Sequence, residues 1–232
     1  MTTSYLERRG QLETYFDRTA AEAWSRLTSD APVSRIRATV RAGRDRMRRT
    51  LLDWLPADIR GQRILDAGCG TGALAIDAAR RGAHVVAIDL SPTLVDLARD
   101  RAARETLPGS IDFRVGDMLD PALGRFDHIV AMDSLIHYRA ADILRVLAAQ
   151  AARANHSILF TFAPRTAALS VMHAVGRLLP RGDRAPAIEP VGEAALRRCI
   201  AHADALNGWR AARSLRIGSG FYISQAMELV RL

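Results

Sequence analysis

The chain contains no lysine: all 33 of its basic residues are arginine, and against 25 acidic residues they give a formal net charge of +8. A positive surplus favours anionic partners, such as a carboxylate substrate, an acidic membrane surface or a nucleic acid. A total lack of lysine is typical of biased genome composition. A solvated arginine-rich surface is therefore an equally good explanation for most of these side chains.

Cysteine and long apolar runs are also scarce. Two cysteines, Cys69 and Cys199, do not make a disulfide framework, so we expect free thiols in a reducing compartment. The best candidate for a membrane span, residues 167–179, is too short and is interrupted by His173 and Arg177. The N-terminus lacks the apolar core of a signal peptide. We therefore expect a cytoplasmic protein with one domain and an appended segment.

A glycine-rich loop between a predicted strand and a predicted helix is the sharpest signal in the chain. It lies in the run Ile-Leu-Asp-Ala-Gly-Cys-Gly-Thr-Gly at residues 64–72. Glycines at such a turn let the backbone approach a ligand closely, because no Cβ is in the way. The carboxylate of Asp66 suits a ligand with an ammonium or sulfonium group and is of no use to a phosphate. We assign to a cofactor site Asp66, Gly68, Gly70 and Gly72.

Two further strand ends fit the same site. Residues 84–89 form a strand that ends in Asp89, 23 residues after Asp66, where an acid accepts hydrogen bonds from ribose hydroxyls, with Leu90 beside it. The strand at 111–115 leads into Gly116, Asp117 and Met118. Here the carboxylate could accept a hydrogen bond from an adenine amino group, and the thioether could pack on the ring.

A fourth strand, residues 126–132, is followed by Asp133 and Ser134, and then by His137 and Tyr138. Ligands of parallel sheets bind at the carboxyl ends of the strands, so these residues are expected to face the same site. A dinucleotide-binding fold is the alternative, because the spacing of Gly68, Gly70 and Ala73 also fits that looser fingerprint. Asp66 and the segment at 116–118 argue against it.

These motifs resemble those of the class I S-adenosylmethionine-dependent methyltransferases, over roughly residues 60–165 and the end of the chain. The resemblance implies an α/β, Rossmann-like fold with a seven-stranded, mostly parallel sheet that ends in an antiparallel hairpin. Residues 209–217 and 221–230 are predicted to form that hairpin. It also implies S-adenosylmethionine as cofactor, S-adenosylhomocysteine as product, and no metal site of the protein's own.

The segment before the sheet is predicted to carry a helix from about Arg35 to Leu55, which Pro56 ends. Gly43 lies on its apolar stripe and costs about 1 kcal/mol relative to alanine, so it serves either close approach of a ligand or packing against the sheet. We expect residues 1–58 to form a helical lid over the cofactor-binding domain at 59–232, which has an insertion at about 164–190.

A closer resemblance is to the magnesium-protoporphyrin IX O-methyltransferases of (bacterio)chlorophyll synthesis. It rests on Tyr-Phe-x-x-Thr at 15–19 with Trp24, on Met-Asp-Ser-Leu-Ile-His-Tyr at 132–138, and on Phe-Ala-Pro-Arg-Thr at 162–166. A tyrosine of oxygenic members that is implicated in catalysis is replaced here by Thr28. The resemblance implies methyl transfer to a propionate carboxylate, and it implies that Tyr15 and Gly43 face the cofactor and that Asp133 and Ser134 belong to its site.

The residue that the sequence places best for catalysis is His137, which could hold one carboxylate oxygen or accept a proton. Guanidinium groups pair bidentately with carboxylates, so Arg165 and Arg184 are candidates for the second propionate. His173 is a candidate ligand of the porphyrin magnesium, which belongs to the substrate. The remaining residues assigned to the substrate are Phe16, Trp24 and Tyr138.

Other functions stay open on the sequence. A quinone or other small-molecule O-methyltransferase would share every cofactor residue. An RNA methyltransferase would suit the positive charge, but residues 133–135 lack the Asn/Asp-Pro-Pro-aromatic motif of the amino-methylating enzymes, so no nucleic-acid partner is expected. A cofactor-binding scaffold without activity is a further alternative. The large subunit of magnesium chelatase and a peripheral contact with the photosynthetic membrane are the expected partners besides Mg-protoporphyrin IX.

Overall fold

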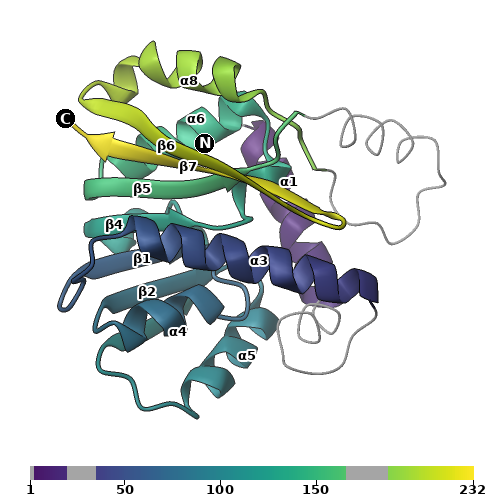
Figure 1. Ribbon diagram of the computed structural model, residues 1–232, viewed down its shortest axis with the longest axis vertical. Coiled ribbons are helices and arrows are strands. Elements are labelled where there is room, and N and C mark those ends of the chain that lie inside the picture. The colour runs from purple at the N-terminus through teal and green to yellow at the C-terminus, as the bar shows by residue number, and fades with distance from the viewer. Residues whose placement is uncertain (1–2, 20–34, 166–187) are drawn as a thin grey trace.

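A seven-stranded sheet, in the order β3-β2-β1-β4-β5-β7-β6, forms the centre of the computed structural model, which describes residues 3–19, 35–165 and 188–232 (Figure 1). Each pair in the series from β3 to β5 is parallel, and β7 runs antiparallel to both of its neighbours. The predicted sheet and its closing hairpin are confirmed. The strands are β1 (Arg63–Ala67), β2 (His84–Asp89), β3 (Ser110–Val115), β4 (Phe126–Ala131), β5 (Ala154–Phe162), β6 (Trp209–Ser219) and β7 (Tyr222–Arg231).

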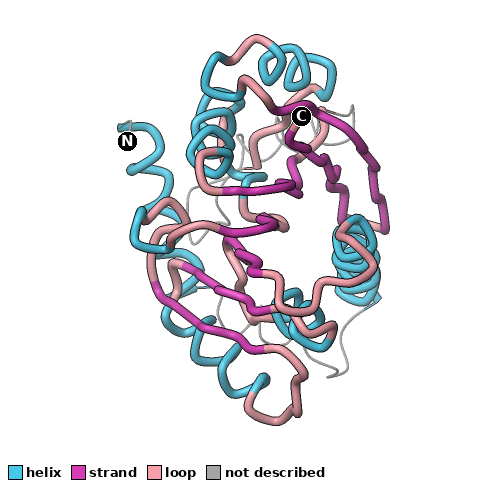
Figure 2. Tube along the Cα trace, turned by 90° about the vertical axis from the view of Figure 1, so that its left-hand side faces the viewer, coloured by secondary structure: helices cyan, strands magenta, loops and turns pink. Residues whose placement is uncertain are grey.

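Helices cover both faces of this sheet (Figures 1 and 2). One face carries α3 (Arg35–Trp54), α4 (Ala73–Arg80) and α5 (Pro92–Ala102), and the other carries α6 (Ala140–Ala151) and α8 (Glu193–Ala201). The N-terminal α1 (Thr3–Thr14) and the π-helical turn η1 (Tyr15–Thr19) belong to the second face, since Tyr5 and Leu12 join its hydrophobic core. Short 3-10 turns complete the described structure: η2 (Pro121–Leu123), η3 (Leu135–His137) and η4 (Asp204–Leu206).

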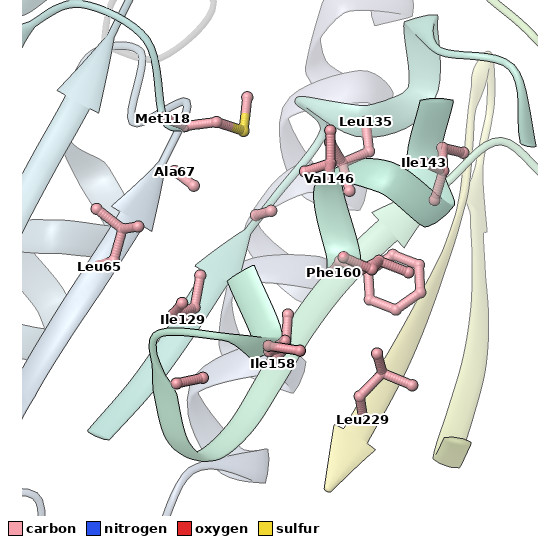
Figure 3. Packing of buried hydrophobic residues seen from close by; sticks show 14 of the residues in the cluster. Leu65, Ala67, Met118, Ile129, Leu135, Ile143, Val146, Ile158, Phe160 and Leu229 are labelled. Atoms are coloured by element: carbon pink, nitrogen blue, oxygen red, sulfur yellow. The ribbon is translucent and has the colours of Figure 1, made fainter. Parts of the chain in front are cut away.

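Two hydrophobic clusters, one on each face, hold the layers together. On β1, Ile64 packs into the cluster beneath α3 and α4, whereas Leu65 packs into the cluster beneath α6 (Figure 3). Side chains alternate between faces along a strand, and both faces are covered, so the central strands β1, β2, β4 and β5 are buried at most positions. This double burial holds the strand ends of the sheet in fixed relative positions.

The long N-terminal helix α3 is part of the core. Its Met47 and Leu51 are fully buried against the sheet. Within the described part of the predicted lid segment at 1–58, residues of α1, η1 and α3 lie at the carboxyl edge of the sheet. The segment that holds Trp24 and Thr28, and the segment that holds His173, Arg184 and the helix predicted at 167–179, lie outside the described residues.

Local signals predicted most element boundaries. Ser91 caps α5, its hydroxyl accepting a hydrogen bond from the Leu94 amide at 3.2 Å, and Pro92 takes the first helical position. The closing hairpin turns at Gly220, which has φ +58°, rather than across all three residues of the Gly-Ser-Gly run at 218–220. In the described part of the chain, no helix has both the length and the apolar character needed to cross a bilayer.

Candidate cofactor and substrate site

A cavity of about 280 Å³ lies at the carboxyl edge of the sheet. All four predicted strand ends contribute to its lining, together with residues of α1, η1 and α3. The sequence-predicted residues that line it are Phe16, Asp66, Gly68, Gly70, Asp89, Leu90, Gly116, Asp117, Met118, Asp133, Ser134, His137 and Tyr138. The fold therefore brings together most of the residues that the sequence assigned to cofactor and substrate.

The glycine loop is held against the second strand. The amides of Gly68 and Cys69 both donate to the Ile88 carbonyl, at 2.8 and 3.0 Å. Gly68 has φ +85°, and a Cβ there would lie 2.5 Å from the Cβ of Ser134. At Gly70 an added Cβ would meet no atom within 4 Å. The loop thus leaves room on the ligand side, which is what its glycines were predicted to provide.

Asp66 lies at the bottom of the cavity. Its side chain is 1% exposed, and its Oδ2 atom has no hydrogen-bond partner among the described residues. Burial, together with the nearby charge of Asp89, raises the pKa of Asp66 to about 7. A buried carboxylate oxygen of this kind calls for a cationic donor. The ammonium group of S-adenosylmethionine fits that requirement.

Asp89 is a second acid that lines the cavity, next to Asp66. Its carboxylate accepts hydrogen bonds from the amides of Gly70, at 2.8 Å, and Ser91, at 3.0 Å. Burial raises the pKa of Asp89, whereas these amide hydrogen bonds lower it. A carboxylate has about four lone-pair sites, so two amide donors leave acceptor capacity for ribose hydroxyls. The glycine loop therefore orients the acid that was predicted to bind the ribose.

Helix α1 reaches Asp117, a contact that the sequence did not predict. The Tyr5 hydroxyl donates to its Oδ1 at 2.8 Å, and the Arg9 guanidinium donates to its Oδ2 at 3.1 Å. Burial is the main reason that the pKa of Tyr5 is raised. The side chain of Met118 is buried beside this acid. Asp117 therefore connects α1 to the end of β3, where the sequence predicted an adenine ring.

The acid after β4 has a different environment. Asp133 has φ +55°, the only positive value outside glycine in the described chain. Its carboxylate accepts hydrogen bonds from the hydroxyls of Tyr222 and Ser224, both at 3.1 Å, and pairs with Arg44 at 3.0 Å. The carboxylate of Asp133 therefore binds protein donors, although the residue itself lines the cavity.

His137 is buried at the cavity wall in η3, just after β4. The ring of Phe16 approaches it from η1, with ring centroids 6.0 Å apart. The next residue, Tyr138, stacks on Tyr5 of α1 with a centroid separation of 5.3 Å. Aromatic residues of α1 and η1 thus contact the two residues that the sequence assigned to catalysis and substrate binding.

Four predicted site residues do not line the cavity. Gly43 faces Tyr222 of β7, where an added Cβ would come within 2.5 Å of Cδ1, so packing explains this glycine. Tyr15 packs edge-on against Phe16, and Gly72 contacts Ala98 and Phe113 behind the loop. Arg165 is exposed, next to a separate hollow that Arg139 and Glu189 also line.

Several cavity residues were not assigned from the sequence. Those that α1 and α3 contribute are Tyr5, Leu12, Arg41, Arg44, Asp45 and Arg48. Helical periodicity does place Arg41, Arg44 and Arg48 on one stripe, but periodicity alone does not say which stripe of a helix faces a ligand. Within the described ranges, no group of three or more histidine, cysteine, aspartate or glutamate side chains could hold a metal ion.

Comparison with known proteins identifies the family of the chain. Residues 64–155 match a methyltransferase domain family, and residues 131–231 match the magnesium-protoporphyrin IX methyltransferase C-terminus family. A magnesium-protoporphyrin O-methyltransferase of Rhodobacter capsulatus is 50% identical over 98% of this chain and 99% of its own. The chain belongs to the magnesium-protoporphyrin O-methyltransferase family. A member from Arabidopsis thaliana is 30% identical over 93% of this chain and 69% of its own.

A solved structure shows the same architecture for this magnesium-protoporphyrin O-methyltransferase family. The crystal structure of magnesium protoporphyrin IX methyltransferase from Synechocystis PCC 6803 with bound S-adenosylhomocysteine superposes with a TM-score of 0.83. It is 29% identical and covers 96% of this chain and 99% of that one. A ubiquinone biosynthesis O-methyltransferase of Xanthomonas oryzae is 36% identical, but over only 56% of this chain.

Proposed function

We propose that this protein transfers a methyl group from S-adenosylmethionine to a propionate carboxylate of Mg-protoporphyrin IX and forms the monomethyl ester in (bacterio)chlorophyll synthesis. The observation that carries the proposal is 50% identity to a magnesium-protoporphyrin O-methyltransferase over nearly the whole chain, including the lid and the closing hairpin. The cavity supports it, because its buried acids suit a cationic cofactor.

The cofactor contributes a sulfonium methyl group that is open to displacement. Asp66 would bind the ammonium group, Asp89 would accept hydrogen bonds from the ribose hydroxyls, and Asp117 with Met118 would hold the adenine. The loop from Gly68 to Gly70 lets the backbone lie against the amino-acid part of the cofactor. Together these residues would fix the position of the cofactor in the cavity.

His137 is the residue that we place next to the substrate carboxylate. A free propionate titrates near pH 4 and is ionised at neutral pH, so the nucleophile needs no obligatory base. The rate then depends on holding a carboxylate oxygen ~3 Å from the methyl carbon, in line with the bond that breaks. His137 donates a hydrogen bond to the other oxygen, or takes the proton of any carboxyl group that enters protonated.

A quinone O-methyltransferase is the second candidate, since a ubiquinone relative shares the methyltransferase core. That relationship does not extend over the remainder of the chain, whereas the porphyrin relatives match it almost throughout. An RNA methyltransferase and a cofactor-binding scaffold have no comparable support.

Further proposals concern the lid and the partners. Residues 1–58 act as the lid over the bound ligands. The other residues that we assign to the substrate, Trp24, His173 and Arg184, lie outside the described residues, the last two in the predicted insertion at about 164–190. Because the porphyrin is flat and apolar, delivery by the large subunit of magnesium chelatase or at a membrane surface would limit its exposure to water. The net charge of +8 suits an acidic membrane.

Mass spectrometry tests the proposed reaction. The purified protein is incubated with S-adenosylmethionine and Mg-protoporphyrin IX, and a parallel sample contains the metal-free porphyrin. We expect one added methyl group on the magnesium porphyrin and little on the metal-free one. Tight binding of S-adenosylhomocysteine without any methylated porphyrin would reject the substrate and favour the quinone alternative, which a catechol-containing quinone precursor would then test.

A further inference from the structure

Three arginines of α3 line the cavity along one stripe of the helix. Arg41, Arg44 and Arg48 are spaced three and four residues apart, which places them on the same side. The acids that we assign to the ammonium group and ribose of the cofactor, Asp66 and Asp89, come from the ends of β1 and β2. The cavity is therefore lined by basic side chains of α3 as well as by acids of the sheet, and the basic side chains suit an anionic part of a ligand.

The arginines differ in what holds them. The guanidinium of Arg48 pairs with two carboxylates, those of Asp45 at 2.8 Å and Asp77 at 2.7 Å. Arg44 pairs with Asp133 at 3.0 Å, and the two side chains are 20% and 5% exposed. Arg44 is therefore connected to the turn after β4, the turn that also carries His137.

Asp133 is fixed from several directions. Besides Tyr222 and Ser224 of β7, Thr161 of β5 donates to its Oδ1 at 3.3 Å and accepts from its amide at 2.7 Å. A non-glycine residue at positive φ is strained and persists only where its surroundings over-determine it. Three hydroxyl donors share the carboxylate with Arg44, so Asp133 is a rigid anchor for that guanidinium.

We propose that Arg44 binds a carboxylate group of a ligand in the cavity, and that Asp133 is the residue that positions it. A guanidinium has five N–H donors in a fixed fork and can bridge two carboxylates. Two ligands of the reaction carry a carboxylate: the amino-acid part of the cofactor and the propionates of the porphyrin. The identity of these ligands rests on the proposed function, whereas the geometry of Arg44 and Asp133 does not.

Ligand pairs that differ in their carboxylates test the proposal with the full chain. Calorimetry compares S-adenosylhomocysteine with 5'-methylthioadenosine, which lacks the amino-acid part, and fluorescence titration compares Mg-protoporphyrin IX with its dimethyl ester. We expect Arg44→Gln to weaken the carboxylate-bearing member of at least one pair about tenfold or more, and to leave its carboxylate-free partner unchanged. Arg46→Gln is the matched control, because Arg46 is exposed on the same helix.

The affected pair identifies the source of the carboxylate, cofactor or porphyrin. Equal weakening of both members of each pair, or no weakening at all, would overturn the proposal. Should Arg44→Gln fail to fold, Arg44→Lys serves in its place, because lysine keeps the charge and loses the bidentate fork. If the wild type binds no porphyrin, the substrate proposal fails, and the cofactor pair alone decides the role of Arg44.

A double-mutant cycle tests the positioning role of Asp133. Asp133→Asn keeps a side chain that tolerates positive φ but removes the negative charge. We expect the effect of Arg44→Gln on the carboxylate-bearing ligand to fall to a small fraction in the Asp133→Asn background. Additive effects of the two substitutions would show that Asp133 does not act through Arg44. A purely structural Asp133 would change thermal stability without changing this coupling.

Discussion

The ring of Phe16 lies edge-on to the imidazole of His137, with centroids 6.0 Å apart and planes inclined by 61°. Phe16 belongs to η1 at the N-terminus, whereas His137 follows β4 more than a hundred residues later. The lid therefore contacts the side chain that we propose holds the substrate. A reaction that depends on positioning and on exclusion of water benefits from such a cover.

Replacement of His137 should lower the rate of methyl transfer without weakening the binding of the cofactor. We expect His137→Ala to lower kcat about a hundredfold while the affinity for S-adenosylhomocysteine changes by no more than about twofold. Rapid quench measurements and calorimetry give the two values. His202→Ala is the control, because His202 is exposed and its Nδ1 is hydrogen-bonded to the Arg198 carbonyl. Normal turnover of His137→Ala would remove His137 from the mechanism.

The affinity for the cofactor product should depend on pH through Asp66. The pKa of this acid is raised to about 7 in the ligand-free fold, and an ammonium group prefers the ionised carboxylate. Binding of S-adenosylhomocysteine should therefore tighten as the pH rises through 7, by up to about tenfold per unit below it. Calorimetry between pH 5.5 and 8.5, a range of roughly three units around that pKa, measures this. Asp66→Asn should bind weakly with a flatter profile.

The same pKa predicts how the stability of the unliganded protein changes. Between about pH 4 and 7 the folded chain keeps a proton on Asp66 that the unfolded chain has released, so stability falls as the pH rises. The loss attributable to Asp66 is at most about 1.4 kcal/mol per pH unit in that window. Urea denaturation at several pH values should show that the free energy of unfolding of Asp66→Asn rises relative to that of the wild type as the pH rises. An identical pH dependence in both would contradict the buried, raised pKa.

Alanine substitutions at two glycines with positive φ should distinguish an effect on ligand binding from an effect on stability. Gly68 and Gly61 have φ +85° and +70°, but only Gly68 would bring a Cβ to within 2.5 Å of another side chain, that of Ser134. Each substitution to alanine should cost about 1–2 kcal/mol of stability through positive φ. Only Gly68→Ala should lose binding of S-adenosylhomocysteine, in a thermal shift assay. Equal effects of both on binding would show that the loop tolerates a side chain.

The glycine of α3 should prove to be a packing residue. A Cβ at Gly43 would lie 2.5 Å from Cδ1 of Tyr222, so Gly43→Ala should lower the free energy of unfolding by about 1–3 kcal/mol despite alanine's better helix propensity. In a Tyr222→Ala background, the same substitution should be neutral or stabilising. Denaturant titration of the four proteins measures both effects. Unchanged stability with weakened cofactor binding would instead favour a ligand role.

The strands and the glycine loop could be predicted because their signals are local. Apolar runs that end in an acid, glycines where φ is positive, and a serine before a proline all act within a few residues. The acids at 66, 89 and 117 were found by the same means, since a parallel sheet brings its strand ends to one edge. The resemblance to known methyltransferases then named the ligand.

The contacts of α1 with Asp117 and the arginines of α3 that line the cavity could not be predicted in this way. Nothing near Asp117 in the sequence indicates that Tyr5 and Arg9 reach it, and nothing near Asp133 indicates that Arg44, Thr161 and Tyr222 meet there. Charged and hydroxyl side chains have many exposed positions open to them along a chain, and only packing of α1, α3 and the closing hairpin selects among these. Short-range backbone and burial preferences were enough to predict the fold and the acids at the strand ends. Which of these carboxylates can meet a ligand depends on the distant donors that the folded chain brings to them, and no local pattern in the sequence records that.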